Sequence, residues 1–189
     1  MTIRGLVRLG LLVSLVALSA TPGRAETAKK HAPPKHPAAT AAAQRIGGAG
    51  PWSAYLYKGA SGPVCYLAGA PEKSEPARFR RKPPSATVTH RPKEKVFDVV
   101  NFYEGYPLKS GSDATLDIDG TNFELFTKND GAWSRTADTD KTIVGAMARG
   151  RTAVIKGIPE KGAATTDTYS LSGFTATLAM IDKACGVTR

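Results

Sequence analysis

The sequence contains few of the residues that enzymes commonly use for nucleophilic or metal chemistry. It has two cysteines and three histidines in 189 residues, and only His90 lies outside the tail that precedes residue 50. No Gly-x-Ser-x-Gly, His-Glu-x-x-His or glycine-rich phosphate loop is present. These absences argue against the common hydrolase, metalloprotease and nucleotide-binding classes, and we predict no cofactor and no metal site.

Long apolar runs are absent except near the amino terminus. Residues 9–20 are apolar, follow Arg4 and Arg8, and precede a stretch of small residues. This arrangement is typical of a secretory signal peptide, cleaved after Ala25 or, as the competing site, after Ser19. The alternative is an uncleaved anchor, but a spanning helix needs about 20 apolar residues. We therefore predict that residues 1–25 are a signal peptide and that the mature protein is not membrane-spanning, and is periplasmic or secreted.

Acidic residues are scarce before residue 96. The formal net charge is +10, and loss of Arg4, Arg8 and Arg24 with the signal peptide would lower it to +7. Residues 72–95 hold eight basic and three acidic residues, whereas the chain from residue 96 holds ten basic and twelve acidic residues. Basic character is thus local, which favours at most a contact with an anionic surface. Nucleic acid is a poor partner for an exported protein.

Large apolar side chains are nearly missing from residues 26–50, which consist mainly of Ala, Pro, Lys and His. Such a segment buries too little surface to offset the entropy lost on ordering, so we predict a disordered linker. His31 and His36 could hold a metal ion there, but two histidines in a flexible tail are more commonly solvated.

From residue 51 the pattern becomes that of short strands, and we predict one domain over residues 51–189. Alternating or β-rich runs predict strands at residues 52–57, 64–67, 86–90, 96–103, 114–118, 122–126, 152–156 and 168–171. Residues 72–84, with several prolines, predict a loop or an edge. The pair Asp119-Gly120 indicates a hairpin turn. The predicted fold is mainly β, a small antiparallel sandwich or barrel.

In two segments the sequence pattern changes from that of strands to that of a helix. Asp140 is expected to cap a short helix that ends before Gly150. A second helix is predicted over residues 174–184 at the carboxyl end, because Phe174, Leu178 and Ile181 recur at helical spacing on one face.

The two cysteines, Cys65 and Cys185, lie near the start and the end of the predicted domain. An even number of cysteines in an exported protein favours a disulfide. In the entropic model a bridge closing so long a loop restricts the unfolded chain by about 4–5 kcal/mol. Two buried free thiols are the alternative.

Three residues could support catalysis. His90 is the one histidine available for a Ser–His–acid set, but no local pattern supports such a set, and a histidine at a strand edge is the plainer interpretation. Asp117 and Asp119 lie two residues apart, so both could face one side of a strand and act as an acid/base pair or bind a cation. The alternative is that Asp119 belongs to a turn.

Two further groups could form a binding surface. The densest basic cluster comprises Arg78, Arg80, Arg81 and Lys82; it could meet anionic lipid headgroups or lipopolysaccharide phosphates, or simply be a solvated loop. The aromatic residues could form a ligand patch or, as is more usual, belong to the core; they are Trp52, Tyr103, Tyr106 and Trp133.

Taken together, the order and spacing of several motifs resemble the invasion-associated locus B family across residues 51–185. The matching pieces are Trp52, residues 64–66, the arginine-rich segment with residues 88–92, and residues 105–111, 117–120, 123–126, 132–133, 167–174 and 184–185. The resemblance implies a secreted or periplasmic bacterial protein, associated in some members with host-cell invasion. It implies no catalytic residues.

Two functions remain as hypotheses. The first is a non-enzymatic exported protein that binds an envelope component or a host-cell surface. The second is a periplasmic hydrolase or other enzyme that uses His90 or the pair Asp117 and Asp119. The first is favoured because an active site normally needs several convergent groups, and the sequence offers none in an evident pattern.

Overall fold

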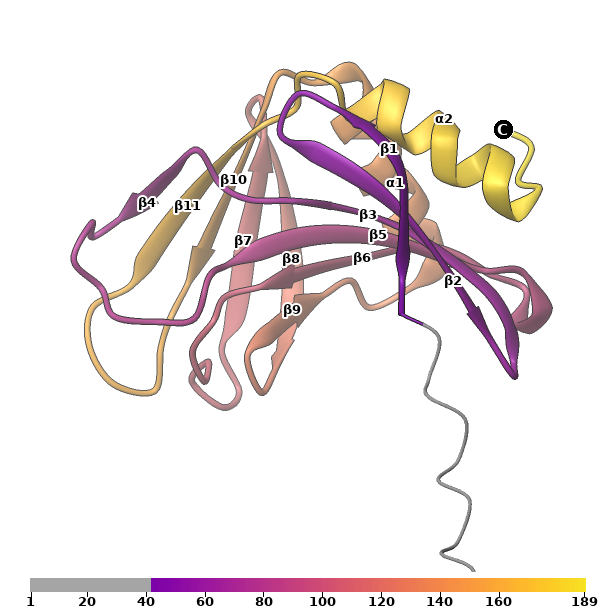
Figure 1. Cartoon of the computed structure of the whole chain (residues 1–189). Helices are drawn as coiled ribbons and strands as arrows, with labels where there is room; N and C mark the ends of the chain where they lie inside the picture. Colours follow the sequence, from indigo (N-terminus) through magenta and orange to yellow (C-terminus); the bar gives the residue numbers. More distant parts are fainter. Residues whose placement is uncertain (1–41) are drawn as a thin grey trace, which may run out of the picture. The chain divides into compact units, whose positions relative to one another are not determined.

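Eleven strands form one antiparallel sheet in the order β1-β2-β3-β5-β6-β9-β8-β7-β10-β11-β4 (Figure 1). The computed structural model describes residues 42–189. The predictions for the signal peptide, for His31 and His36, and for the linker up to residue 41 lie outside the described residues.

The strands fall into two groups along the sheet. The first group is β1 (Gln44–Ala49), β2 (Trp52–Gly59), β3 (Gly62–Gly69), β5 (Ser85–Arg91) and β6 (Val96–Tyr103). The second is β9 (Gly131–Trp133), β8 (Thr121–Lys128), β7 (Asp113–Ile118), β10 (Thr152–Gly157), β11 (Thr165–Ser170) and the edge strand β4 (Lys73–Glu75). A single 3-10 turn, η1 (Pro92–Glu94), joins β5 to β6.

Alternation of side chains explains why these segments form strands with one buried face. In β5, for example, Ala86, Val88 and His90 are buried while the residues between them are partly exposed. Neighbouring strands continue the row, because Val88 pairs with Leu67 of β3 and with Val100 of β6. The period of two therefore places one continuous apolar face on the sheet.

Both helices pack on that face. The first, α1 (Ala137–Arg149), begins after Thr136, whose hydroxyl accepts from the Thr139 amide at 3.1 Å, and it ends at Gly150. The second, α2 (Phe174–Cys185), ends at Gly186, which has a positive φ of 65°. Helix α2 lies against β1, β2, β3 and β5, and α1 against β6.

The disulfide between Cys65 and Cys185 is present, as the cysteine count predicts, with a Cα–Cα distance of 6.0 Å. It joins β3 to the last residue of α2. The predicted stripe of α2 is also confirmed, since Phe174, Leu178 and Ile181 are all buried. The bridge and the stripe together hold α2 on the sheet.

The predicted class, mainly β and antiparallel with two short helices and the last at the carboxyl end, is confirmed. The sheet does not close into a barrel, because the edge strands β1 and β4 do not pair with each other.

One boundary differs from the prediction. Residues 44–49, placed in the disordered linker by composition, form β1 and pair with β2. Their order comes from backbone pairing and from close packing on α2: a Cβ on Gly47 would lie 2.6 Å from Met180 Sδ. Composition alone reveals neither interaction: the pairing is with the adjacent strand β2, and the packing is on Met180 of α2, which is distant in the sequence.

Candidate functional site

The pair Asp117 and Asp119 serves a hairpin turn. Asp117 Oδ1 accepts from the Gly120 amide at 3.1 Å. The Asp119 carboxylate accepts from the amides of Arg151 and Thr152 at 2.8 and 3.1 Å, and Asp119 itself has a positive φ of 48°. The Asp117 carboxylate is thus bound within the turn, and the Asp119 carboxylate joins the turn to the start of β10, so the turn interpretation of Asp119 agrees with the structure.

The basic cluster divides into an exposed and a buried part. Arg78, Arg80 and Lys82 are exposed, whereas the Arg81 side chain is only 6% exposed and its guanidinium pairs with buried carboxyl groups. The surface available to an anionic partner thus consists of Arg78, Arg80 and Lys82, and their contact with such a partner stays a prediction.

Arg81 is the centre of a buried network formed by the segment before β5 and by β11. Its two terminal nitrogens bind both oxygens of Asp167, one of them at 2.7 Å. Nη1 also donates to the main-chain oxygen of Glu104 at 3.1 Å and lies 3.5 Å from Glu104 Oε2. Burial opposes the charge on Arg81, but the hydrogen bonds and charge of Asp167, with the charge of Glu104, raise the pKa of the guanidinium.

Glu104 is the second acid of this network and is fully buried. Burial and the nearby charge of Asp167 raise its pKa to about 7, although Arg81 and the Tyr106 hydroxyl, 3.2 Å from Oε2, act in the opposite direction. Tyr106 also lies 2.5 Å from Thr165 Oγ1. Within residues 42–189, Glu104 Oε1 and the Tyr169 hydroxyl are buried without a hydrogen-bond partner. Glu104 is therefore a buried carboxyl group with a raised pKa.

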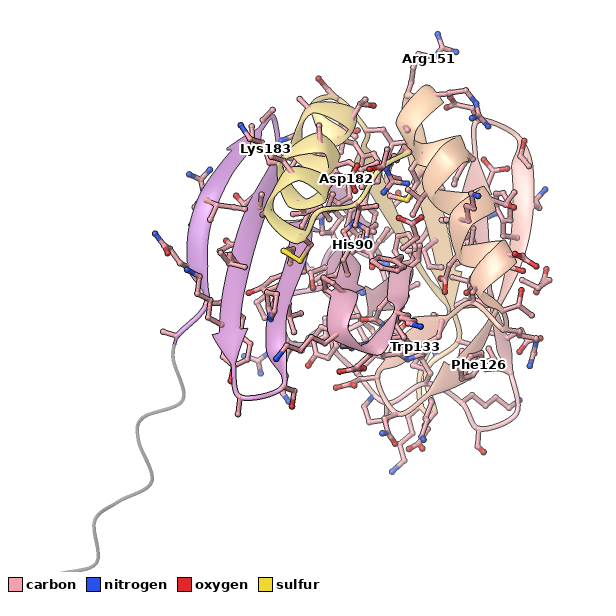
Figure 2. All side chains as sticks on the ribbon, turned by 90° about the vertical axis from the view of Figure 1, so that its right-hand side faces the viewer. His90, Phe126, Trp133, Arg151, Asp182 and Lys183 are labelled. Atoms are coloured by element: carbon pink, nitrogen blue, oxygen red, sulfur yellow. A yellow bond between two sulfur atoms is a disulfide. The ribbon has the colours of Figure 1, made fainter. Side chains whose placement is uncertain are left out.

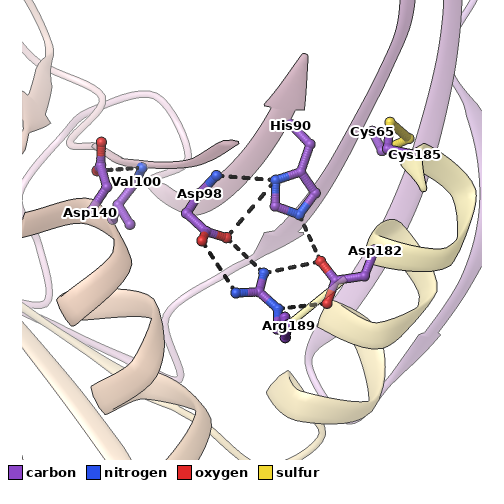
Figure 3. A network of polar contacts seen from close by, with 8 residues as sticks. All are labelled: Cys65, His90, Asp98, Val100, Asp140, Asp182, Cys185 and Arg189. Atoms are coloured by element: carbon purple, nitrogen blue, oxygen red, sulfur yellow. Dashed lines mark hydrogen bonds and ion pairs between the residues drawn. A yellow bond between two sulfur atoms is a disulfide. The ribbon is translucent and has the colours of Figure 1, made fainter. Parts of the chain in front are cut away.

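His90 lies in a second network, between the sheet and α2 (Figures 2 and 3). Its Nδ1 accepts from the Asp98 amide at 3.1 Å, and its Nε2 lies 2.9 Å from Asp182 Oδ1. Because Nδ1 is an acceptor, the proton of the neutral ring is on Nε2, which donates to Asp182. Burial, with the charge of Arg189, lowers the pKa of His90 even though Asp98 and Asp182 favour its protonated form.

Arg189 connects the two carboxylates of the His90 network. It donates to Asp182 from Nε at 2.6 Å and from Nη2 at 3.0 Å. It donates to Asp98 from Nη2 at 2.6 Å and from Nη1 at 3.2 Å (Figure 3). Residues 186–189, with Phe97, Asp98 and Lys141, line a surface hollow of about 490 Å³ beside this network. Arg189 therefore bridges the two carboxylates and balances one of their two negative charges.

A third contact anchors α1 beside the His90 network. Asp140, in the first turn of α1, accepts from the Val100 amide at 2.9 Å (Figure 3). Burial raises the pKa of this carboxyl. The residue predicted to cap α1 thus lies inside the helix and joins it to β6, while Thr136 is the cap.

These networks contain side chains that sequence reasoning missed, although the pattern held a signal. Asp167 occupies an inward position of β11, two residues before the buried Tyr169, and Asp182 follows Leu178 by one helical turn on the buried stripe of α2. An acid at an inward position needs a buried partner. The interpretation of His90 as a strand-edge residue was wrong, because His90 is completely buried.

Two further features are absent from residues 42–189. No group of three or more His, Cys, Asp or Glu side chains is placed to hold a metal ion. Neither α1 nor α2 is long and apolar enough to cross a membrane.

Comparison with known proteins places the fold in one family. The model of the invasion associated locus B (IalB) protein family matches residues 52–182. The crystal structure of invasion associated protein B from Bartonella henselae is similar in fold, with a TM-score of 0.52 and 14% sequence identity over 76% of this chain and 98% of that chain. No curated protein matches. From the family match over most of the chain, we conclude that this protein belongs to the invasion associated locus B family.

Proposed function

We propose that this protein is exported to the periplasm or the medium and acts there by binding a partner, without catalysis. The observation that carries the proposal is the internal pairing of its polar groups. Both ring nitrogens of His90 are occupied by Asp98 and Asp182, and both carboxylates are bound by Arg189. A general base needs a nitrogen free to reach a substrate proton.

The other buried network supports the same proposal. A carboxyl with a strongly raised pKa is a common mark of an active site, and Glu104 has one. Its side chain is only 1% exposed, however, and its neighbours Arg81 and Asp167 are 6% and 0% exposed. No substrate reaches such a group in this conformation, so its perturbed pKa is explained by a structural ion-pair network.

Export is supported by the signal-like leader and by the disulfide. Lasting disulfides form in oxidising compartments such as the periplasm, and Cys65–Cys185 is present. The partner that we propose is a component of the cell envelope or a host-cell surface, consistent with a family described as invasion associated.

The test of export is cell fractionation with mass spectrometry of the mature chain. We expect a protein shortened by about 19 to 25 residues, in periplasm or medium, with no free thiol before reduction. Full-length protein in the cytoplasm would contradict the proposal.

The test of binding is capture of envelope and host-membrane fractions by the immobilised mature protein. If the exposed basic cluster takes part, the triple variant Arg78→Ser, Arg80→Ser, Lys82→Ser loses capture. The matched control removes three exposed basic residues elsewhere, with the changes Lys141→Ser, Arg151→Ser and Lys156→Ser. Equal loss in both variants would indicate attraction by net charge only.

A screen for hydrolase activity tests the absence of catalysis. We expect no turnover above that of a His90→Gln variant. Turnover that disappears with His90→Gln, in a variant that stays folded, would favour the enzyme hypothesis instead.

A further inference from the structure

The face of the sheet opposite the helices carries an aromatic hollow. It has a volume of about 370 Å³ and lies across β6, β8 and β9. Its lining consists of Asn101, Tyr103, Phe126, Lys128, Asn129, Asp130, Gly131 and Trp133. Between these positions, Phe102 and Ala132 point the other way into the core, so the aromatic hollow is on the outer face.

Strand register explains why a hollow forms there. Trp133 pairs with Asn101 on one side and with Phe126 on the other. In the next row, Gly131 lies between Tyr103 and Lys128. Because Gly131 has no side chain, the Trp133 indole and the Asn101 amide lie over it and form two walls of the hollow.

The positions of these two walls depend on the missing side chain of Gly131. A Cβ at this position would lie 2.8 Å from Trp133 Nε1 and 2.9 Å from Asn101 Nδ2. Both atoms are at the ends of side chains, so an alanine would displace recognition groups without disturbing the backbone. Gly131 has no positive φ, and the substitution therefore acts by filling space.

The walls of the aromatic hollow are held in place. The Arg135 guanidinium lies 5.7 Å from the centre of the Phe126 ring and is bound by both oxygens of Asp113 at 2.7 Å. The turn at the rim is fixed as well, because the main-chain oxygens of Asn129 and Asp130 accept from backbone amides at 2.8 Å. A preformed site loses less entropy on binding a ligand.

The two tryptophans of the chain show that the aromatic hollow differs from core. Trp52 is 1% exposed and its Nε1 donates to the Ser170 oxygen at 2.9 Å. Trp133 is half-buried on the outer face, and no group within residues 42–189 accepts from its Nε1. A tryptophan with a solvent-exposed ring face and an indole N–H that has no acceptor is placed to contact a ligand.

We propose that the aromatic hollow binds a neutral saccharide through Trp133 and Tyr103, with Asn101 and Asp130 bonding its hydroxyl groups. A sugar ring offers apolar C–H faces and many hydroxyls, which match aromatic rings surrounded by amide and carboxylate groups. One lysine and one aspartate leave the lining without excess charge, so neither an anion nor a cation is favoured. The volume lies within the ~300–1,000 Å³ of small-molecule pockets.

This inference rests on the binding role proposed above and names the ligand class of that role. It also separates two surfaces, because the exposed basic residues Arg78, Arg80 and Lys82 do not line the aromatic hollow. Anionic partners would use the basic cluster, and neutral glycans the aromatic hollow.

The test is titration of the mature protein with methyl β-D-glucopyranoside, methyl β-D-galactopyranoside and N,N′-diacetylchitobiose, followed by tryptophan fluorescence. The chain has two tryptophans, and with Trp133→Phe only the buried Trp52 remains. We expect a saturable change with at least one saccharide in the wild type, and none with Trp133→Phe. Cyclohexanol, a ring of similar size without the pattern of hydroxyls, should give no change.

Affinity is measured independently by ligand-observed NMR. Gly131→Ala and Trp133→Ala should each weaken binding at least tenfold. Tyr66→Ala is the matched control, since Tyr66 stacks on Tyr55 at 4.9 Å outside the aromatic hollow, and it should bind as the wild type does. Thermal melting checks that each variant is folded.

Three results would overturn the inference: no saccharide binds, cyclohexanol binds equally well, or Gly131→Ala and Trp133→Ala leave binding unchanged. The proposed function is tested separately by capture of envelope and host-membrane fractions. If no saccharide binds while envelope or host-membrane fractions are still captured, the saccharide site is wrong while the binding role stands.

Discussion

The two buried charge networks have the same make-up, an arginine between two carboxyl groups, but they differ in access to water. In the Arg81 network the side chains of Arg81, Glu104 and Asp167 are 6%, 1% and 0% exposed. In the His90 network the side chains of Arg189, Asp98 and Asp182 are 36%, 11% and 12% exposed. The first network must therefore be satisfied by the protein alone, whereas water can solvate part of the second.

The networks also differ in which titratable group is uncharged. In the Arg81 network one arginine faces two acids, and Glu104 takes up a proton near neutral pH because burial raises its pKa to about 7. In the His90 network the ring donates to Asp182 and stays neutral, since burial lowers its pKa. In each network the uncharged group is a fully buried one, an acid in the first and a histidine in the second. Burial, more than the identity of the group, therefore determines which group is uncharged.

The largest effect is expected when each network loses its arginine. Arg81→Met leaves two acids buried without a cation and should lower the free energy of unfolding by about 3–5 kcal/mol. Arg189→Met should cost on the order of 1 kcal/mol, because Asp98 and Asp182 keep contact with water. Urea unfolding at pH 7.5 measures both. Equal losses would show that burial does not distinguish the networks.

Breaking the disulfide should disturb the His90 network selectively. Cys185 follows Asp182 by about one helical turn, at the end of α2. Cys65→Ser and Cys185→Ser should each cost about 2–5 kcal/mol, and the double variant should be no worse than either, because each change removes the same bond.

Nuclear magnetic resonance locates the disturbance. The ring signals of His90 should shift in the serine variants, while those of Tyr106, in the Arg81 network, should not. Additive losses of stability, or equal shifts at Tyr106, would contradict this assignment.

A more gradual effect is a pH dependence assigned to Glu104. Its pKa is raised in the folded protein from 4.5 to about 7, so between these values the folded state binds more protons than the unfolded state. Stability should therefore fall as pH rises from about 5 to 7, by on the order of 2–3 kcal/mol, and then level off. His90 acts in the opposite direction, because a lowered histidine pKa costs stability as pH falls below about 6.5.

The Glu104→Gln variant separates the two contributions. Urea unfolding at several values between pH 5 and 8 should give a wild-type curve that falls relative to the Glu104→Gln curve as pH rises. Parallel curves would mean that Glu104 does not titrate in this range.

The parts of the fold that could be predicted are those encoded by local sequence patterns. The helix ending at Cys185 has an apolar stripe at Phe174, Leu178 and Ile181, and the hairpin at Asp119-Gly120 has the residues that a tight turn requires. Such signals lie within ten or twelve neighbouring residues. The disulfide was also predictable, because only two cysteines exist to pair.

The charge networks could not be predicted because their members meet only in the folded chain. Arg81 and Asp167 are 86 residues apart, and His90 and Asp182 are 92 apart. Their contact depends on strand order, in which β4, near the start of the domain, lies beside β11, near its end. In sequence, Arg81 therefore looks like one more basic residue of a solvated loop.

In the part of the chain that the structure describes, the open sheet has two edge strands whose outer hydrogen-bonding groups are unpaired, which favours pairing of one molecule with the next. At one end, β4 has only three residues, of which Lys73 and Glu75 are exposed and ion-paired at 3.0 Å. At the other, the register of β1 shifts between Arg45 and Gly47, and Gly47 and Gly48 have positive φ angles of 157° and 159°. Neither edge strand is a long, regular strand with which another molecule could pair. The protein can thus keep an unclosed sheet without polymerising through its edges, even at high protein concentration.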